Sequence, residues 1–386
     1  MKIIDGAYYF NDPAECPYCE QLPPEREDYF YHLEDDLKAF PYCWCYAAVG
    51  GRSTGKTYGA LDYARVNRIP FAFMKRTKDD VKLLCAGTGR IGGNQAQFGA
   101  DFSPFVPINR DKGCNVKAFS IQSGIGAFWE CDDDNEPLNA PIGQIFSLNS
   151  VSKIKGFNME DRLVIMDEYI ADKGDRVNRK EGEQLLKCYD TIARDTEERT
   201  GEPVRLVLLA NASQANCPIN ETLEVVDHLA YMDMHGYQYC YLPDRLILLH
   251  RLYDERQHEA RAQRAIYKGM AGTKWLDESL GNHFANDDFS MVQKINLKGY
   301  RPVCSLQYKR KMFYIYQHGR GDYYMTSSKF NDKTAPFYDL DREAPRQAFY
   351  FEQQLRLKEA IINDSMLFAS YHMYDIIMNF KKIFLV

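Results

Sequence analysis

The sequence predicts an α/β protein in which a mostly parallel sheet is followed by a smaller α+β domain. Between residues 41 and 245, short apolar runs alternate with helical or loop stretches, which is the pattern of parallel strands joined by crossovers. From about Val303 the pattern changes to three closely spaced strands, and the stretch Phe351–Phe384 is helical in character. No internal repeat or low-complexity segment interrupts either part.

The composition limits the classes of protein that need to be considered. A chain of 386 residues with 45% hydrophobic residues can bury a sizeable core and suggests two domains. The net charge of −6 argues mildly against a nucleic-acid binder with a uniformly basic surface. We expect no membrane span, because no apolar stretch of about 18 residues is present. The N-terminus lacks a signal-peptide core, so the 11 cysteines are expected to be reduced thiols in a cytosol.

The first predicted strand leads into a glycine-rich loop. The run Gly50–Thr57 has the form G-x-x-x-x-G-K-[ST], which is the phosphate-binding P-loop. The apolar run Cys43–Val49 precedes it as a buried strand, and a helix is expected over Thr57–Val66. Glycines let backbone N–H groups close around phosphates, and the helix N-terminus adds positive dipole. The sequence therefore predicts a nucleoside triphosphate site.

Individual P-loop residues have predicted roles. Lys56 is expected to reach the β- and γ-phosphates, and Thr57 is expected to hold Mg²⁺ through its hydroxyl group. Arg52 is a candidate for neutralising charge on the transferring phosphoryl group. The complete predicted nucleotide-binding set is Gly50, Arg52, Ser53, Gly55, Lys56, Thr57 and Tyr58.

Five more strands are expected in the first domain, at Phe71–Lys75, Ala118–Ile121, Gly143–Leu148, Leu163–Met166 and Arg205–Ala210.

The strand that begins at Leu163 ends in two acids. Asp167 fits the residue that holds Mg²⁺ in P-loop NTPases, often through a water molecule. Glu168 is placed to polarise a water that attacks the γ-phosphate, which predicts hydrolysis rather than switching alone. The alternative is an ordinary strand end with solvated acids. The preceding P-loop favours the catalytic interpretation.

Two further residues are catalytic candidates. Asn211 ends the strand Arg205–Ala210 and could sense the γ-phosphate or order the attacking water, although a turn-forming asparagine is the alternative. Arg194 lies on the helix before this strand and beyond the acids. It would therefore serve a neighbouring subunit's site more easily than its own, the alternative being a solvated arginine at a helix end.

Two other motifs carry less weight. Gly87–Gly92 matches G-x-G-x-x-G, but no strand leads into it and no helical pattern follows, so a dinucleotide site is not expected. The C-x-x-C pair Cys16 and Cys19 lacks a thioredoxin-like context. With Cys43 and Cys45 it could form a four-thiolate zinc site, although buried or surface thiols are the favoured interpretation.

Taken together, these residues resemble the DNA-encapsidation ATPases, terminase-like packaging motors, of the phi-29-like podovirus group. The P-loop has that family's Gly-x-Arg-x-x-Gly-Lys-[ST]-Tyr form. The remaining matches, in chain order, are a basic strand end at Met74–Lys78, a serine- and lysine-rich approach at Ser150–Gly156, the acids at Asp167–Tyr169, a helix end with the trans-acting arginine at Asp190–Arg194, and a coupling motif at Leu209–Ala212.

The resemblance implies an ASCE-type P-loop NTPase with ATP and Mg²⁺ as cofactors. It implies a homo-oligomeric ring, a pentamer, that pushes double-stranded DNA into a procapsid and meets the phage portal. In this scheme Arg194 completes the next subunit's site and Asn211 links the γ-phosphate state to movement. The implied location is the bacterial host cytoplasm, transiently on the procapsid. Whether a packaging RNA takes part stays open, and no membrane partner is expected.

In the same family the C-terminal part resembles an RNase H-like terminase nuclease that has lost its chemistry. Such nucleases need clustered carboxylates to hold two metals. Here the strands Val303–Tyr308 and Met312–Gln317 contain no Asp or Glu, although Asp339, Asp341 and Asp364 remain. We therefore expect a nuclease relic that docks or grips and does not cut.

The expected domain organisation has four parts: an N-terminal extension at 1–40, the ATPase domain at 41–245, a helical linker at 246–295 and the RNase H-like domain at 296–386. DNA contacts are expected to be sequence-independent phosphate contacts, which salt weakens. A solvated basic face is the alternative for these cations. The candidate DNA-binding residues are Lys75, Arg76, Lys78, Lys153 and Lys155.

Three other functions are compatible with these motifs. A helicase-like DNA-translocating ATPase would separate strands. A P-loop small-molecule kinase would transfer phosphate to a metabolite, and such an enzyme would not want a glutamate directly after Asp167, where this sequence has Glu168. A non-catalytic scaffold would use the nucleotide only to set assembly.

Overall fold

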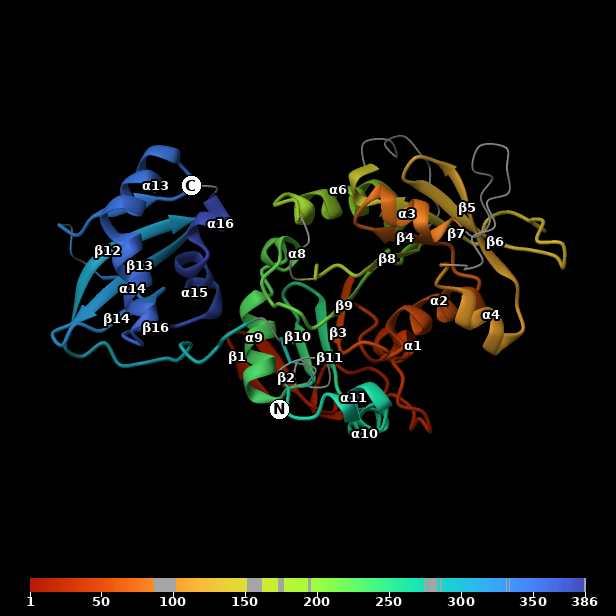
Figure 1. Ribbon diagram of the computed structural model, residues 1–386, viewed down its shortest axis with the longest axis horizontal. Helices are drawn as coiled ribbons and strands as arrows, with labels where there is room; N and C mark the ends of the chain where they lie inside the picture. The colour runs from red at the N-terminus through yellow and green to blue at the C-terminus, as the bar shows by residue number, and fades with distance from the viewer. Residues whose placement is uncertain are drawn as a thin grey trace. The chain divides into compact units, whose positions relative to one another are not determined.

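The structure is a computed structural model that describes residues 1–86, 102–150, 162–172, 177–193, 196–273, 276, 283–284, 287–330, 332 and 334–384. Two compact units are present (Figure 1). The first combines Met1–Leu223 with Tyr231–Asn286, and the second combines Glu224–Ala230 with Asp287–Val386. Among the described residues, no helix is long and apolar enough to cross a membrane.

The first unit is built on an 11-stranded sheet. In spatial order its strands are β1 (Lys2–Ile4), β2 (Ala7–Phe10), β10 (Tyr239–Leu242), β11 (Ile247–Leu252), β3 (Cys45–Gly50), β9 (Arg205–Asn211), β8 (Leu163–Asp167), β4 (Phe71–Lys75), β7 (Gly143–Ser147), β6 (Ile125–Glu130) and β5 (Val116–Gln122).

The six strands in the middle of this sheet, from β11 to β7, are parallel. Antiparallel strands extend the sheet at both sides. All residues of β3 and β8 are buried, as expected for parallel strands covered on both faces. Because β3, β9 and β8 are parallel neighbours, their carboxyl ends meet at one edge of the sheet.

Helices connect and cover these strands. Within the described residues they are α1 (Leu33–Ala39), α2 (Lys56–Val66), α3 (Lys78–Leu84), α4 (Val106–Lys112), α6 (Glu181–Ala193), α7 (Thr196–Thr200), α8 (Pro218–Thr222), α10 (Glu255–Ala262) and α11 (Ala265–Gly269), with 3-10 turns η1 (Pro13–Glu15) and η2 (Leu148–Ser150). Helix α9 (Val226–His235) is divided between the two units after Ala230. At the start of α3, the Thr77 hydroxyl accepts from the Asp80 N–H and the Asp80 carboxylate accepts from the Thr77 N–H. This capping box ends the β4–α3 connection sharply.

The second unit, drawn in blue in Figure 1, has a five-stranded sheet covered by helices. Its strands β12, β13 and β14 are antiparallel, while β15 and β16 run parallel to β12 and β14. In spatial order the strands are β15 (Phe337–Asp339), β12 (Tyr300–Tyr308), β13 (Lys311–His318), β14 (Tyr323–Thr326) and β16 (Met366–Phe368). The helices are α13 (Glu343–Phe349), the π-helix η3 (Tyr350–Gln354), α14 (Leu355–Ile362), α15 (Tyr371–Met378) and α16 (Phe380–Phe384).

Most predicted strands are confirmed. The bounds of β4 are those predicted, and β5, β7, β8 and β9 differ from the prediction by one or two residues at their ends. The three strands expected after Val303 are β12, β13 and β14. The predicted C-terminal helices are present, but β16 interrupts them.

The expected domain organisation needs two corrections. Strands β1 and β2, assigned to an extension, join the main sheet because β2 pairs with β10. Strand β11, assigned to a helical linker, pairs with β3 along its whole length and is central to the sheet. The compact unit extends to Asn286, rather than ending at residue 245.

One glycine in α2 makes a testable contribution to stability. Gly59→Ala is expected to lower the free energy of unfolding by about 1–3 kcal/mol, the usual cost of overpacking. The added Cβ would lie 2.2 Å from the backbone carbonyl oxygen of Tyr31, which a higher helix propensity does not offset. Chemical denaturation measures the change. The control Gly269→Ala in α11 has open space around the new methyl group and is expected to be harmless. Equal stability of both variants would contradict the packing argument.

Candidate nucleotide site

A cavity of about 490 Å³ lies where the P-loop and the carboxyl ends of β8 and β9 meet. Three segments far apart in the sequence form it, and each was expected to contribute. Thr54, Asp172 and Ala210 also line it, although the sequence analysis did not select them. The predicted residues that line the cavity are Arg52, Ser53, Gly55, Lys56, Thr57, Tyr58, Asp167, Glu168 and Asn211.

The P-loop backbone enters α2 through a residue in the left-handed region. Gly55 has φ +80° and directly precedes α2, a left-handed position that favours glycine. Gly50 does not line the cavity, but its backbone contacts the next strand so closely that an added Cβ would lie 2.7 Å from the Leu252 Cβ. Gly55 is thus needed for its backbone conformation, and Gly50 is needed for close packing.

Lys56 is buried at the centre of the loop. Its ammonium group donates to the carbonyl oxygen of Gly51 (2.7 Å), to the hydroxyl of Thr54 (2.9 Å) and to the carbonyl oxygen of Gly50 (3.3 Å). Burial lowers the pKa of Lys56 to about 7, an effect that the nearby Asp167 carboxylate opposes. A buried cation is costly without an anionic partner. The loop therefore favours a negatively charged ligand.

The metal-binding candidates lie beside each other. The Thr57 hydroxyl donates to Asp167 Oδ1 at 2.9 Å, which joins the P-loop helix to the end of β8. Hydroxyl and carboxylate oxygens suit Mg²⁺, which is typically held by one or two protein carboxylates together with substrate phosphates and water. Within the described part of the chain, no group of three or more His, Cys, Asp or Glu side chains could hold a metal by itself. The donor set therefore fits Mg²⁺ brought in with a nucleotide.

The same finding bears on the zinc hypothesis. Cys16, Cys19, Cys43 and Cys45 all lie in the described residues and are free thiols there. No metal-binding group of three or more side chains among the described residues includes them.

Lys75 contacts both acids at the end of β8. Its ammonium group lies 2.8 Å from Asp167 Oδ2 and 2.9 Å from Glu168 Oε2. Burial disfavours the charged form, but the two carboxylates outweigh it and raise the pKa of Lys75. The side chain is 16% exposed. The expectation that Lys75 contacts DNA stays a prediction, and in this structure its charge is directed into the nucleotide site.

Arg76 has a structural role at the same strand end. Its guanidinium donates to the backbone carbonyl oxygens of Glu168 (3.1 Å) and Tyr169 (3.0 Å), and it pairs with Glu181 at the start of α6 (3.1 Å). Glu168 has a left-handed backbone with φ +54°, a conformation that costs free energy and needs support. Arg76 supplies this support, and its expected role in DNA binding stays a prediction.

The other predicted residues divide into three groups. Asn211 lies at the end of β9, where its Oδ1 accepts from Lys56 at 3.5 Å. Lys78 is exposed on the first turn of α3. The third group lies outside the described residues and consists of Arg194, Lys153, Lys155 and the glycine motif at 87–92.

Asp172 is a site residue that the sequence analysis missed. It pairs with Arg52 Nη2 at 2.9 Å, on the exposed rim of the cavity. No motif marks this position, since it lies in an irregular stretch after β8. Asp172 follows Glu168 closely in the sequence, which could have suggested that it lies near the cavity. Its partner Arg52 could not be identified without the fold.

One prediction concerns the metal. Asp167→Asn is expected to weaken binding of ATP in the presence of Mg²⁺ about ten-fold or more, because a carboxylate ligand is lost. Binding of ATP with EDTA should stay unchanged or improve, since a negative charge is removed. Calorimetry under the two conditions measures the difference. The matched control Asp172→Asn should keep the full effect of Mg²⁺ on ATP binding. Loss of that effect in the control alone would contradict the assignment to Asp167 and indicate that the metal binds at the rim of the cavity.

Comparison with solved structures identifies a fold that this chain shares with a known protein. No protein family model matches this sequence, and no curated protein matches it. Among solved structures, the Phi-28 gp11 DNA packaging motor matches with a TM-score of 0.53 and 16% identity, over 92% of this chain and 98% of that one. The Gp16 C-terminal domain of Bacillus virus phi29 matches 26% of this chain and 95% of that domain, with 15% identity and a TM-score of 0.20. The large terminase ATPase domain of Thermus phage P74-26 matches 44% and 60%, with 13% identity and a TM-score of 0.23. The first match covers nearly all of both chains, and the chain therefore has the fold of a DNA packaging motor protein.

Proposed function

We propose that this protein is an ATPase that drives double-stranded DNA into a viral procapsid as one subunit of a homo-oligomeric ring, a pentamer. The observation that carries the proposal is the cavity into which Lys56, Thr57, Asp167 and Glu168 project from separate segments. The fold that the chain shares with the Phi-28 gp11 DNA packaging motor supports the coupling of this site to DNA movement. The phage portal and procapsid are the proposed partners in the bacterial host.

ATP is the proposed substrate, and each cavity residue has a role. Lys56 and Arg52 bind the β- and γ-phosphates, and Tyr58 of α2 lines the same cavity. Thr57 and Asp167 hold Mg²⁺, which neutralises charge that develops on the phosphate oxygens when it is bound. Asn211, within 3.5 Å of Lys56, responds to the γ-phosphate.

Glu168 accepts a proton from the attacking water. Its carboxylate is 67% exposed and reaches into the cavity from the end of β8. A carboxylate held by an ammonium group is not free to approach a water molecule elsewhere in the cavity. We therefore propose that Glu168 must leave Lys75 before hydrolysis, so that the 2.9 Å ion pair holds the enzyme inactive.

The arrangement of α6 supports action of Arg194 between subunits. The helix begins at Glu181, which pairs with Arg76 beside the acids. Further along, the Tyr189 hydroxyl donates to the carbonyl oxygen of Val204 (2.6 Å), just before the amino end of β9. The described part of this helix, which ends at Ala193, therefore leads from the cavity toward the opposite edge of the sheet. That direction favours a role in a neighbouring subunit's site.

The second unit is proposed to be an RNase H-like relic that docks or grips. Its first two strands, β12 and β13, carry no acidic residue, and Asp339 at the end of β15 pairs with Arg342 (3.2 Å). Lys78, Lys153 and Lys155 remain proposed contacts to DNA phosphates, which would make DNA binding sensitive to salt.

Glu168→Gln tests the chemistry. The variant is expected to bind ATP normally and to lose ATP hydrolysis by about 100-fold or more, because proton acceptance by the carboxylate is lost. Steady-state ATPase assays with and without duplex DNA measure this. The control Glu198→Gln, an exposed carboxylate on α7, should be unaffected.

The same ATPase assays, together with a strand-displacement assay, separate the alternatives. Wild-type hydrolysis that ignores duplex DNA would favour a small-molecule kinase, and strand displacement would favour a helicase. Unchanged function of Glu168→Gln would favour a scaffold and contradict the proposal.

Mixing two inactive variants tests the shared site. Arg194→Ala and Lys56→Ala should each lack ATPase activity, for different reasons. A mixture should regain a fraction of the activity, because a subunit with Lys56 can receive Arg194 from a neighbour. ATPase activity over a range of mixing ratios measures this recovery, and its absence at every ratio would contradict the shared site.

A further inference from the structure

Two elements outside the P-loop motif hold the backbone of the loop. One is the irregular segment Pro23–His32, which we term the N-terminal strap, and the other is the first turn of α10. The residues that line the phosphate cavity come from the loop, from α2, from the ends of β8 and β9 and from the stretch after β8. The strap and α10 therefore contact the loop from outside the phosphate cavity.

Two successive carbonyl groups of the loop accept hydrogen bonds from these elements. The side-chain amide of Gln257 in α10 donates to the carbonyl oxygen of Ser53 at 3.3 Å. The Tyr31 N–H of the strap donates to the carbonyl oxygen of Thr54 at 2.9 Å. Gln257 is only 3% exposed, although it is a polar residue on a helix of polar and charged residues. Its amide is thus directed inward to the loop rather than to solvent.

The direction of these two carbonyl groups determines where the neighbouring N–H groups point. In a planar trans peptide, the C=O and the N–H point in opposite directions. The N–H of Thr54 therefore points away from Gln257, and the N–H of Gly55 points away from the strap. Thr54 and Gly55 both line the phosphate cavity. Successive N–H groups turned to one side form a concavity that binds anions, so the outer contacts favour phosphate binding.

Ser53 has a backbone conformation that needs support. Its φ is +61°, in the left-handed region that residues other than glycine rarely adopt. Such a conformation costs free energy and persists only where the surroundings stabilise it. The hydrogen bond from Gln257 supplies this stabilisation. Without it, the peptide between Ser53 and Thr54 would be free to rotate and to turn a carbonyl oxygen toward the phosphates.

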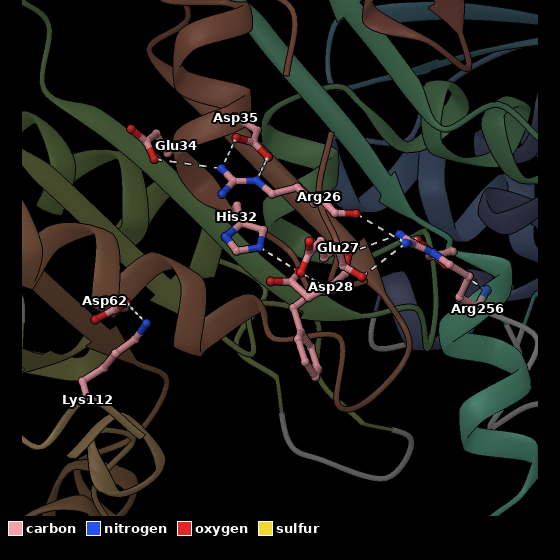
Figure 2. A network of polar contacts seen from close by, with 11 residues as sticks. Arg26, Glu27, Asp28, His32, Glu34, Asp35, Asp62, Lys112 and Arg256 are labelled. Carbon is pink, nitrogen blue, oxygen red and sulfur yellow. Dashed lines mark hydrogen bonds and ion pairs between the residues drawn. The ribbon is translucent and has the colours of Figure 1, made fainter. Parts of the chain in front are cut away.

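The start of α10 fixes the position of Gln257. The Asp254 carboxylate caps the helix and accepts from the N–H groups of Arg256 at 2.8 Å and Gln257 at 3.4 Å. The Arg256 guanidinium donates to the backbone carbonyl oxygens of residues 26–28 in the strap at 3.2–3.4 Å (Figure 2). One helical turn therefore holds the strap through Arg256 and the P-loop through Gln257.

We propose that Gln257 is a positioning residue for triphosphate binding, which acts by holding the Ser53 carbonyl group away from the phosphates. This inference rests on the proposed function of the phosphate cavity. It adds to the P-loop motif a residue that lies 204 positions further along the chain. Gln257 acts through the backbone of the loop and does not contact the phosphates itself.

The test measures dissociation constants for inorganic tripolyphosphate. We expect Gln257→Leu and Gln257→Glu each to weaken binding about ten-fold, the effect of losing one hydrogen bond to a charged group. Gln257→Glu keeps the size of the side chain and places an acceptor where the donor was. The matched control is Gln263→Leu, at the exposed C-terminal end of α10, which should bind as tightly as the wild type.

A second background separates positioning from general support of the fold. Glycine adopts φ near +60° without strain, so Ser53→Gly removes the need for support from Gln257. In the Ser53→Gly background, we expect Gln257→Leu to weaken tripolyphosphate binding about two-fold or less, because the two residues are coupled. Chemical denaturation without ligand checks that each variant is folded.

Two results would overturn the positioning role and leave the P-loop function intact. One is full tripolyphosphate affinity in both Gln257 variants. The other is an equal loss of affinity in the two Ser53 backgrounds, which would make Gln257 a general support of α10. Failure of the wild type to bind tripolyphosphate at all would instead contradict the proposed function.

Discussion

The hydrogen bond between the Thr57 hydroxyl and Asp167 Oδ1, at 2.9 Å, is the contact on which the remaining site geometry depends. It joins the helix after the P-loop to the end of β8. Parallel pairing of β3 with β9 and of β9 with β8 brings the two ends to one edge. A hydroxyl and a carboxylate at this distance can share one metal ion. The fold therefore creates the site by strand order, and the hydrogen bond sets its spacing.

Two lysines with different partners determine the charge distribution of the site. Lys56 is a buried cation whose nearest partners are carbonyl and hydroxyl oxygens, whereas Lys75 is paired with both acids. A triphosphate with its metal would supply anionic partners to Lys56 and a competing cation to Asp167 and Glu168. Ligand binding would thus change the partners of both lysines together. Arg76 holds the backbone of Glu168 in place. The Glu168 side chain can therefore change partners while its backbone stays fixed.

The sequence predicted the local features of the site because each is carried by a short motif. The P-loop, the acids after Leu163 and Asn211 were all placed at strand ends, and parallel pairing puts those ends together. Contacts across the sheet were not predictable in this way. Lys75 looked like part of a basic run, and only the pairing of β4 with β8 places it beside the acids. The N-terminal strands were missed because β2 pairs with β10, more than 200 residues away in sequence.

The central claim is that the P-loop and the acids of β8 hold one triphosphate and its metal. A crystal structure with Mn²⁺ and a non-hydrolysable ATP analogue tests this directly, because the anomalous signal locates the metal. The account predicts one metal peak at bonding distance from the Thr57 hydroxyl, next to Asp167 and the analogue's phosphates. A metal and a triphosphate bound away from the P-loop, or a metal peak remote from Asp167, would contradict it.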